Sequence, residues 1–143
     1  GNSIPVAMDF NFRLTKIGLR SRFSVDPTMQ EMYASLSSSE DVALGISHTG
    51  SSRDTVHSLE LAKQRGTRTI CITNHSDSPL TRHSDFCLFT ATRISHFREE
   101  RMASNLATLA LTEALYVGIC VERSDASAQA VSQTLRATGH RKY

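Results

Sequence analysis

The sequence predicts an α/β fold, a three-layer α/β/α sandwich whose central sheet is parallel. The first observation is that short apolar runs alternate with stretches in which apolar residues recur at helical spacing. The second is that short connections join these segments, which favours parallel strands linked by right-handed crossover helices. The third is that the run at residues 42–46 is almost entirely apolar, as expected of a strand in a sheet covered on both faces.

Length and composition fit one domain covering residues 1–143. A chain of 143 residues with 39% hydrophobic content can bury a substantial core but has no room for a second domain. Its 16 basic and 14 acidic residues are spread along the chain, so no basic stripe for nucleic acid is evident. Cys71, Cys87 and Cys120 lie far apart in apolar runs, which favours reduced core thiols in a cytoplasmic protein. We expect no membrane span and no signal peptide.

The N-terminal segment predicts a helix, because apolar residues recur at helical spacing up to a glycine stop signal: Val6, Phe10, Leu14, Ile17 and Gly18. Ser3 is expected at the N-terminus of this helix, either as a simple N-cap or as a ligand-binding hydroxyl. Phosphate-binding loops normally follow a strand, and no strand precedes this helix. We therefore expect the first strand of the sheet to lie upstream of Gly1.

Residues 22–25 are predicted to form a short strand, and Asp26-Pro27 is predicted to start a second helix, with proline at the first helical position. The buried stripe of this helix is expected to be Met29, Met32, Tyr33 and Leu36. The polar residues 37–40 then form a loop that leads into the central strand.

The stretch 41–55, DVALGISHTGSSRDT, predicts a buried strand, a hydroxyl-rich turn and the start of a helix. Gly50 is the residue in the turn that is free to take positive φ and let backbone N–H groups approach a ligand. A helix that begins near 51–54 directs its unpaired N–H groups and the positive end of its dipole toward the same point, so a phosphate is the expected occupant.

Ordinary capping is the alternative explanation for such a turn, because serine and threonine are common at helix starts. Five hydroxyl side chains within residues 47–55 are more than one cap uses, which favours a ligand site. The predicted ligand-binding residues are Ser3, Ser47, His48, Thr49, Gly50, Ser51, Ser52 and Thr55.

The rest of the chain continues the alternation. The helix after the turn is expected to end at Gly66, and strands are predicted at 69–73 and 85–90. The turn-rich loop 74–81 follows the first of these strands, so it is expected to face the same crevice as the hydroxyl turn. A long helix over residues 106–119, apolar on more than one face, suggests burial against both the sheet and another subunit. A final helix is predicted from about residue 127 to Thr138.

These motifs resemble the sugar isomerase (SIS) domain family over nearly the whole chain. The resemblance rests on GNS-x2-VA-x-D at the start, S-x-T-G-S-S-R-D-T, TICITN followed by SPL, and SDFCLFT. It implies a flavodoxin-like or Rossmann-like sheet whose S-x-S/T-G turn holds the phosphate of a phosphosugar. Ser47, Thr49 and Ser52 match the family's phosphate-binding hydroxyls, His48 takes the polar position between the first two, and Ser3 matches the serine of the family's first loop.

Within that family, REERMASNLATLALTEALYVGIC is similar to the corresponding helix of RpiR-type transcriptional regulators. The matching positions are Ser104, Leu106, Leu109, Leu111, Glu113 and Leu115. Asn105 stands where many such regulators have arginine. The resemblance implies a phosphosugar sensor that forms a homodimer or tetramer, and a DNA-binding helix-turn-helix domain upstream of this chain.

The competing function is an aldose-ketose phosphosugar isomerase, which needs a positioned base near the carbon whose proton moves. The candidates are His48, His57, His75, His96, Glu99 and Glu100, while His83 and His140 have no partner that the sequence identifies. Glu99 and Glu100 also fit a solvated charged turn beside Arg98 and Arg101, which favours binding without turnover. No zinc spacing or nucleotide-binding glycine motif occurs, so we expect no metal and no cofactor. Because binding without turnover is favoured, we also expect no catalytic residue.

Overall fold

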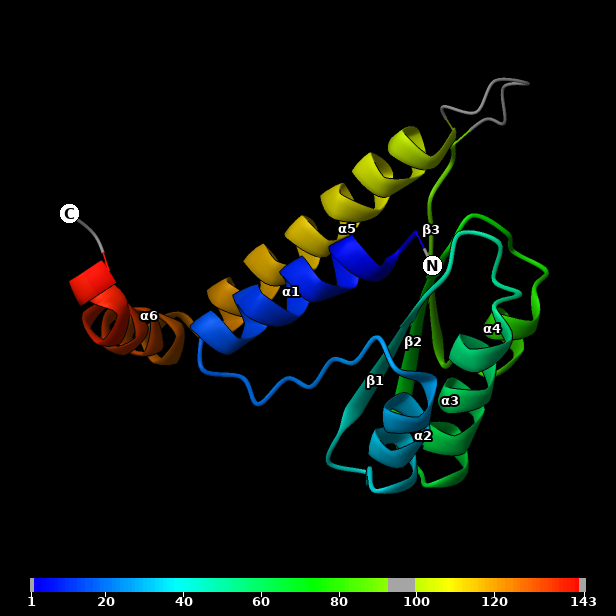
Figure 1. Ribbon diagram of the computed structural model, residues 1–143, viewed down its shortest axis with the longest axis horizontal. Coiled ribbons are helices and arrows are strands. Elements are labelled where there is room, and N and C mark those ends of the chain that lie inside the picture. The colour runs from blue at the N-terminus through cyan, green and yellow to red at the C-terminus, as the bar shows by residue number, and fades with distance from the viewer. Residues whose placement is uncertain (1, 93–99, 142–143) are drawn as a thin grey trace.

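A computed structural model describes residues 2–92 and 100–141 (Figure 1). Three strands form a parallel sheet in the order β1-β2-β3: β1 (Val42–Ile46), β2 (Arg68–Thr73) and β3 (Phe86–Phe89). The helices are α1 (Ile4–Lys16), α2 (Pro27–Ser35), α3 (Arg53–Gln64), α4 (Pro79–Arg82), α5 (Glu100–Glu122) and α6 (Ser124–Thr138), followed by the 3-10 helix η1 (Gly139–Arg141). The predicted strands at 42–46, 69–73 and 85–90 are thus confirmed to within one residue at each end.

The sheet lies between α3 and α4 on one side and α1 and α5 on the other, which confirms the predicted α/β/α arrangement (Figure 1). The core on the α3 side consists of Leu59, Cys71 and Leu80, with Ala43, Val56 and Cys87 packed against them. Cys71 and Cys87 are register partners on neighbouring strands and are free thiols. Burial raises the pKa of the Cys87 thiol to about 11, as expected of a structural rather than a reactive cysteine.

The other face of the sheet is only partly covered, so the expectation that the central strand is buried on both faces is wrong. Side chains alternate along a strand, and Ala43 faces the α3 core, so Val42 points to the opposite face, where it is 62% exposed. Phe86 precedes Cys87 on β3 and is also exposed. The physical reason is visible in Figure 1, where α1 and α5 extend away from the sheet instead of lying along it.

Two predictions about residues 22–36 are also wrong. Residues 22–25 are irregular chain rather than a strand, because β1 pairs with β2 and not with this segment. In α2, Ala34 is the buried residue and Tyr33 is half-buried, whereas Met32 is 52% and Leu36 76% exposed, and Met29 is also exposed. Only one side of this short helix packs against α3. Helical spacing in the sequence predicted the wrong residues for that side. Its start is as predicted, since the Asp26 side chain accepts a hydrogen bond from Met29 N.

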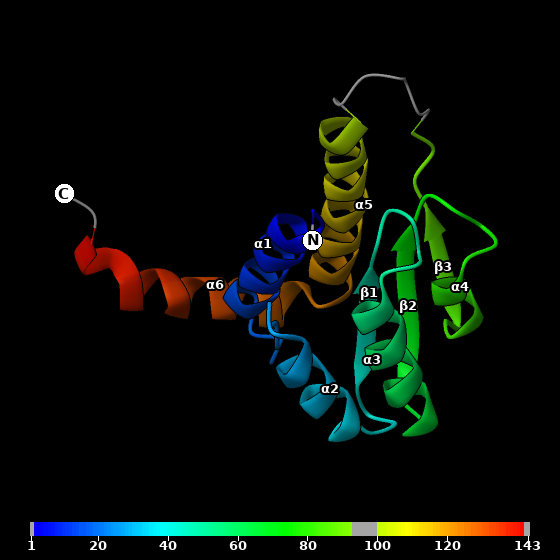
Figure 2. The ribbon, with the colours of Figure 1, turned by 45° about the vertical axis from the view of Figure 1, so that its right-hand side comes forward.

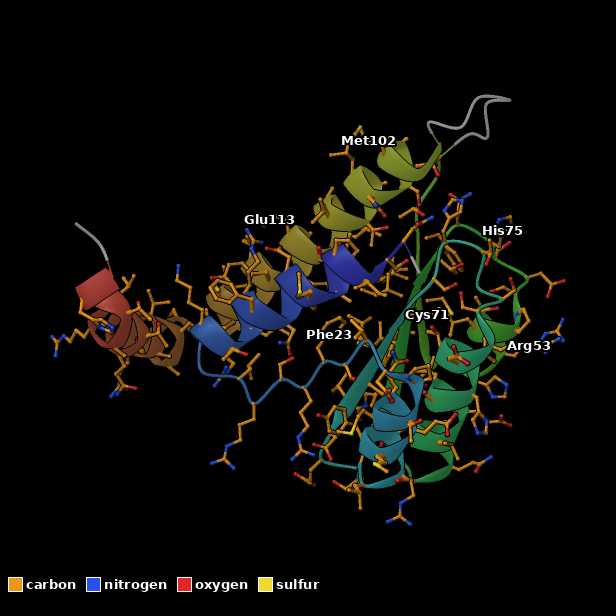
Figure 3. The ribbon with its side chains drawn as sticks, in the orientation of Figure 1. Phe23, Arg53, Cys71, His75, Met102 and Glu113 are labelled. Atoms are coloured by element: carbon orange, nitrogen blue, oxygen red, sulfur yellow. The ribbon has the colours of Figure 1, made fainter. Side chains whose placement is uncertain are left out.

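Helices α1 and α5 pack against each other through a charged contact. Arg13 of α1 forms an ion pair with Glu113 of α5. Its Nε atom lies 3.6 Å from Asp9 Oδ2, and its guanidinium carbon lies over the Tyr116 ring, 4.8 Å from the ring centroid. Figure 3 shows Glu113 where α5 meets α1, whereas Met102 projects from α5 away from α1. The hydrogen bond and charge of Glu113 raise the pKa of Arg13, which therefore stays protonated.

We expected no segment long and apolar enough to span a membrane, but one helix, α5, meets that description by its length and composition. Met102–Glu122 has a mean hydropathy of 1.4 over its most apolar window, and only 17% of that window is buried. Core helices of soluble proteins also reach such values, so the finding is weak evidence for a membrane span. It does show that α5 presents an unusually apolar and largely uncovered surface among the described residues.

The hydroxyl turn as candidate functional site

The turn between β1 and α3, residues 47–52, lies at the carboxyl end of the sheet (Figure 2). Ser47 N donates to Ile72 O at 3.0 Å, which extends the pairing of β1 with β2 by one residue. The chain then turns sharply, because Gly50 takes a φ of +63° and its N–H donates to Ser47 O at 3.1 Å. We refer to residues 47–52 as the hydroxyl turn.

Gly50 is required by packing as well as by its backbone angle. A Cβ atom at this position would lie 2.5 Å from Ser78 Cβ, closer still to Ser78 Oγ, and 3.0 Å from Thr73 Oγ1. Leu80 N also donates to Gly50 O at 2.9 Å. The loop 74–81 therefore packs directly against the turn, as predicted from its position after β2.

The hydroxyls of the turn form two pairs. Ser47 and Ser52 share a hydrogen bond of 3.0 Å between their Oγ atoms, and Ser51 Oγ donates to Thr49 Oγ1 at 2.8 Å. Ser47 is buried, whereas Thr49, Ser51 and Ser52 are exposed. The structure thus brings a group of hydroxyl donors to the surface around one bend, without any charged side chain between them.

The start of α3 offers backbone donors at the same place. Ser52 is the N-cap residue, yet its side chain makes no capping bond to the helix, and the first intrahelical hydrogen bond runs from Val56 N to Ser52 O at 2.9 Å. The amides of the first turn, residues 53–55, therefore keep their N–H groups for another acceptor, and the helix dipole favours an anion. The alternative explanation was that the serines and threonines here serve as ordinary helix caps. Ser52 does not cap α3 with its side chain, so this explanation does not account for it.

Thr55 lies in the first turn of α3 with its methyl group directed toward Gly45, where a Cβ would be 3.4 Å from Thr55 Cγ2. Its half-buried position gives it a packing role in addition to any contact with a ligand.

His48 connects the turn to two other elements. Its carbonyl oxygen accepts hydrogen bonds from Asn74 N at 3.0 Å and from Thr73 Oγ1 at 3.1 Å, both at the end of β2. Its ring nitrogen Nδ1 lies 2.7 Å from Ser104 Oγ of α5. The His75 ring approaches edge-on, with 6.0 Å between the ring centroids and 77° between the planes. Figure 3 labels His75 at this end of the sheet.

Ser3 is the N-cap residue of α1 and is half-buried, with no side-chain capping bond. Figures 1 and 2 both place the start of α1 at the end of the sheet where the strands finish. The start of α1 is therefore at the correct end of the molecule for a ligand contact, but among the described residues Ser3 forms no side-chain hydrogen bond with the hydroxyl turn.

Two residues of this region were absent from the predicted site. Ser78 is the N-cap residue of α4, adjoins Gly50 and is 2% exposed. Ser104 contacts His48 from α5. Both belong to motifs that carry the family resemblance, SPL and the α5 pattern, but only the folded chain reveals that they adjoin the turn.

The candidate bases for an isomerase are scattered. His57 is exposed on α3, 3.8 Å from Glu60, and is not part of the turn. His48 belongs to the hydroxyl turn, and the ring of His75 lies against the ring of His48. His96 and Glu99 lie outside the described residues, as does the side chain of Glu100. Within residues 2–92 and 100–141, no group of three histidine, cysteine or acidic side chains is arranged to hold a metal.

Comparison with known proteins identifies relatives of this chain. An uncharacterized HTH-type transcriptional regulator of Haemophilus influenzae is 30% identical over 135 residues, which cover 94% of this chain and 47% of the regulator. The chain thus spans about half the length of that relative.

Two solved structures have the same fold. The Vibrio vulnificus NanR protein complexed with ManNAc-6P superposes with a TM-score of 0.91 at 25% identity, covering 99% of this chain and 53% of NanR. The sugar isomerase domain of an RpiR transcription factor from Sphaerobacter thermophilus gives a TM-score of 0.80 at 25% identity, covering 95% of this chain and 74% of that structure.

The family model of the SIS domain matches residues 1–118, which include the hydroxyl turn, its supporting loop and most of α5. The resemblance predicted from the sequence motifs is confirmed. This chain belongs to the SIS domain family.

Proposed function

We propose that residues 1–143 form one SIS domain that acts as the phosphosugar-binding effector domain of an RpiR-type transcriptional regulator. The observation that carries this proposal is the hydroxyl turn at the N-terminus of α3. Ser47, Thr49, Ser51 and Ser52 supply hydroxyls there, and the first-turn amides of α3 supply backbone donors. The relatives named above support the regulatory role, and the ManNAc-6P complex of NanR supports the ligand class.

A phosphate group suits this site better than a carboxylate or a neutral sugar. Its three terminal oxygens accept several hydrogen bonds at once, and the positive end of the α3 dipole favours its charge. The sugar or sugar acid would extend from the phosphate toward His48 and His75, which border the turn. Ser3, at the start of α1, is proposed as an additional contact.

Sensing is favoured over isomerisation by the surroundings of the turn. Isomerisation requires a general base held near the substrate carbon. Of the candidates that the structure describes, His57 is an exposed surface residue paired with Glu60. The ring of His48 is held beside the turn by a hydrogen bond with Ser104 of α5. The alternative function remains an aldose-ketose phosphosugar isomerase.

The proposal includes a homo-oligomer, a dimer or a tetramer, formed through α5. Ligand binding changes the regulator's activity if it favours one arrangement of subunits over another. The output is DNA occupancy by a helix-turn-helix domain upstream of this chain, as the HTH-type relative suggests. A transcriptional regulator acts where the DNA is, so the proposed location is the cytoplasm.

The site is tested by replacing Ser47 and Ser52 together with alanine and measuring binding of ManNAc-6P, glucose 6-phosphate and inorganic phosphate by calorimetry. Each lost hydrogen bond to a charged group is worth about 1.5–3 kcal/mol, so affinity should fall at least tenfold. Ser39→Ala is the matched control, because Ser39 is an exposed serine in the loop that precedes β1. Equal affinity of the double variant and the wild type would contradict the assigned site.

Sensor and isomerase are separated by incubating the protein with each sugar phosphate and following aldose-ketose interconversion by NMR. A sensor binds the ligand and leaves it unchanged over hours. Conversion at ordinary enzyme rates, about 1–1000 per second, would establish the isomerase instead.

A further inference from the structure

The hydrogen bond between Ser104 and His48 joins α5 to the hydroxyl turn across 56 positions of sequence. Ser104 is only 5% exposed, and its Oγ lies 2.7 Å from His48 Nδ1. Serine hydroxyls inside helices commonly bond to a carbonyl of the preceding turn, so a hydroxyl directed to a distant ring nitrogen is a specific contact.

The backbone and the ring of His48 are held by different elements. The carbonyl of His48 is fixed by Thr73 and Asn74 of the β2 end, and the ring is fixed by Ser104 of α5. His48 is half-buried, so part of the residue remains accessible to solvent. With Nδ1 engaged by Ser104, Nε2 is the ring nitrogen left for a ligand.

The direction of the hydrogen bond decides what Nε2 can do. A neutral imidazole carries one N–H, and the nitrogen that accepts a hydrogen bond is the one without it. If the Ser104 hydroxyl donates to Nδ1, then Nε2 carries the hydrogen and is a donor. A donor at this position complements the acceptor oxygens of a sugar phosphate, whereas the other tautomer would present a lone pair to them.

We propose that Ser104 is a positioning residue of the ligand site, whose hydroxyl donates to His48 Nδ1 and holds the imidazole as the Nε2–H tautomer toward the bound phosphosugar. This inference rests on the proposed function and extends the site to α5. Ser104 itself does not touch the ligand. It determines which hydrogen-bonding group His48 offers and where the ring lies.

The first test is a double-mutant cycle with ManNAc-6P as the probe. Ser104→Ala should weaken binding about three- to tenfold, the loss expected for one neutral hydrogen bond. His48→Gln keeps an amide donor near the Nε2 position but has no partner for Ser104, so adding Ser104→Ala to it should change affinity less than twofold. Additive losses in the double variant would overturn the proposal, because they would mean that Ser104 does not act through His48.

The matched control is Thr108→Ala. Thr108 lies one turn further along α5, is buried, and donates its hydroxyl to Ser104 O at 2.9 Å, so this variant removes a buried helix hydroxyl without removing the partner of His48. Its affinity should stay within twofold of the wild type. Ser104→Thr retains the hydroxyl and should restore part of the affinity that Ser104→Ala loses. A loss at Thr108 equal to that at Ser104 would indicate a general effect on α5 and overturn the proposal.

The second test reads the tautomer directly in ligand-free protein, by ring ¹⁵N chemical shifts of His48. The wild type and Thr108→Ala should show the Nε2–H form, and Ser104→Ala should show a mixture of both tautomers. An Nδ1–H form in the wild type would overturn the proposal. Because this measurement needs no ligand, it remains decisive even if none of the sugar phosphates binds, which would refute the proposed function alone.

Discussion

Gly50 shows how one residue satisfies two requirements of the candidate site. Its φ of +63° is strained for any side chain, and Ser78 and Thr73 fill the space that a side chain would need. Gly66 provides a comparison within the same chain, since its φ is +79° but no atom lies within 4 Å of a Cβ built there. Substitutions at these two glycines therefore distinguish the cost of backbone strain from the cost of a steric clash.

Gly66→Ala is expected to destabilise the fold by about 1–2 kcal/mol, the cost of a left-handed alanine. Gly50→Ala should cost more, because the clash with Ser78 adds to the same strain, and it should also abolish phosphosugar binding by displacing the turn. Urea denaturation monitored by circular dichroism measures both stabilities, and calorimetry measures binding. Equal destabilisation by the two substitutions would show that the loop 74–81 adapts to a methyl group at no cost.

At the scale of elements, the entry into β3 is joined to β2 and α3 by Asp85. Its Oδ2 accepts hydrogen bonds from Thr69 N at 2.9 Å and Thr69 Oγ1 at 3.0 Å, and its Oδ1 lies 3.2 Å from Lys63 Nζ. The backbone hydrogen bond from Thr69, followed by the interaction with Lys63, lowers the pKa of Asp85 from its ordinary value of 3.8. The ionised carboxylate therefore favours the folded state.

A lowered folded-state pKa means that this stabilisation is complete above pH 3.8 and is lost as the pH falls through the folded-state pKa. Asp85→Asn should therefore lower the melting temperature at pH 7, and the difference from the wild type should shrink as the pH falls below 3.8. Asp77→Asn is the control, because Asp77 pairs with Arg82 at 3.3 Å on the surface, where ion pairs contribute little. A difference between Asp85→Asn and wild type that is independent of pH would exclude the charge as its cause.

For the whole molecule, the outstanding feature is the uncovered apolar surface of α5. Leu106 is 63% and Val121 69% exposed, and Met102, Leu109 and Val117 are also exposed along the same helix. The far face of the sheet adds Val42 and Phe86. A surface of this kind is typical of an interface with another subunit.

If α5 forms the proposed homo-oligomer, Leu106→Glu should weaken association at least tenfold, because a charge would be buried without a partner. Analytical ultracentrifugation over a range of micromolar concentrations measures the change. Leu36→Glu is the matched control, since Leu36 at the end of α2 is an exposed leucine too, at 76% against 63% for Leu106. A wild-type protein that is monomeric throughout that range would refute the interface.

The sequence by itself determined the features that depend on neighbouring residues. The strands predicted at 42–46, 69–73 and 85–90 follow from short apolar runs and are observed to within one residue, and the bend at Gly50 follows from a glycine among hydroxyls between a strand and a helix. The family also followed from local motifs, each of which occupies a short stretch of chain. These features are encoded within a few residues, so a single sequence reveals them.

Only the tertiary structure decided how those segments meet. Helical spacing marks an apolar stripe but does not say what covers it, so Met32 and Leu36 were expected in the core and are exposed, and α5 is far less buried than its composition suggests. The contacts of Ser78 with Gly50 and of Ser104 with His48 join residues 28 and 56 positions apart, which no local pattern encodes. Hydrogen bonding and burial between distant segments depend on the relative placement of whole elements, and that placement exists only in the folded chain.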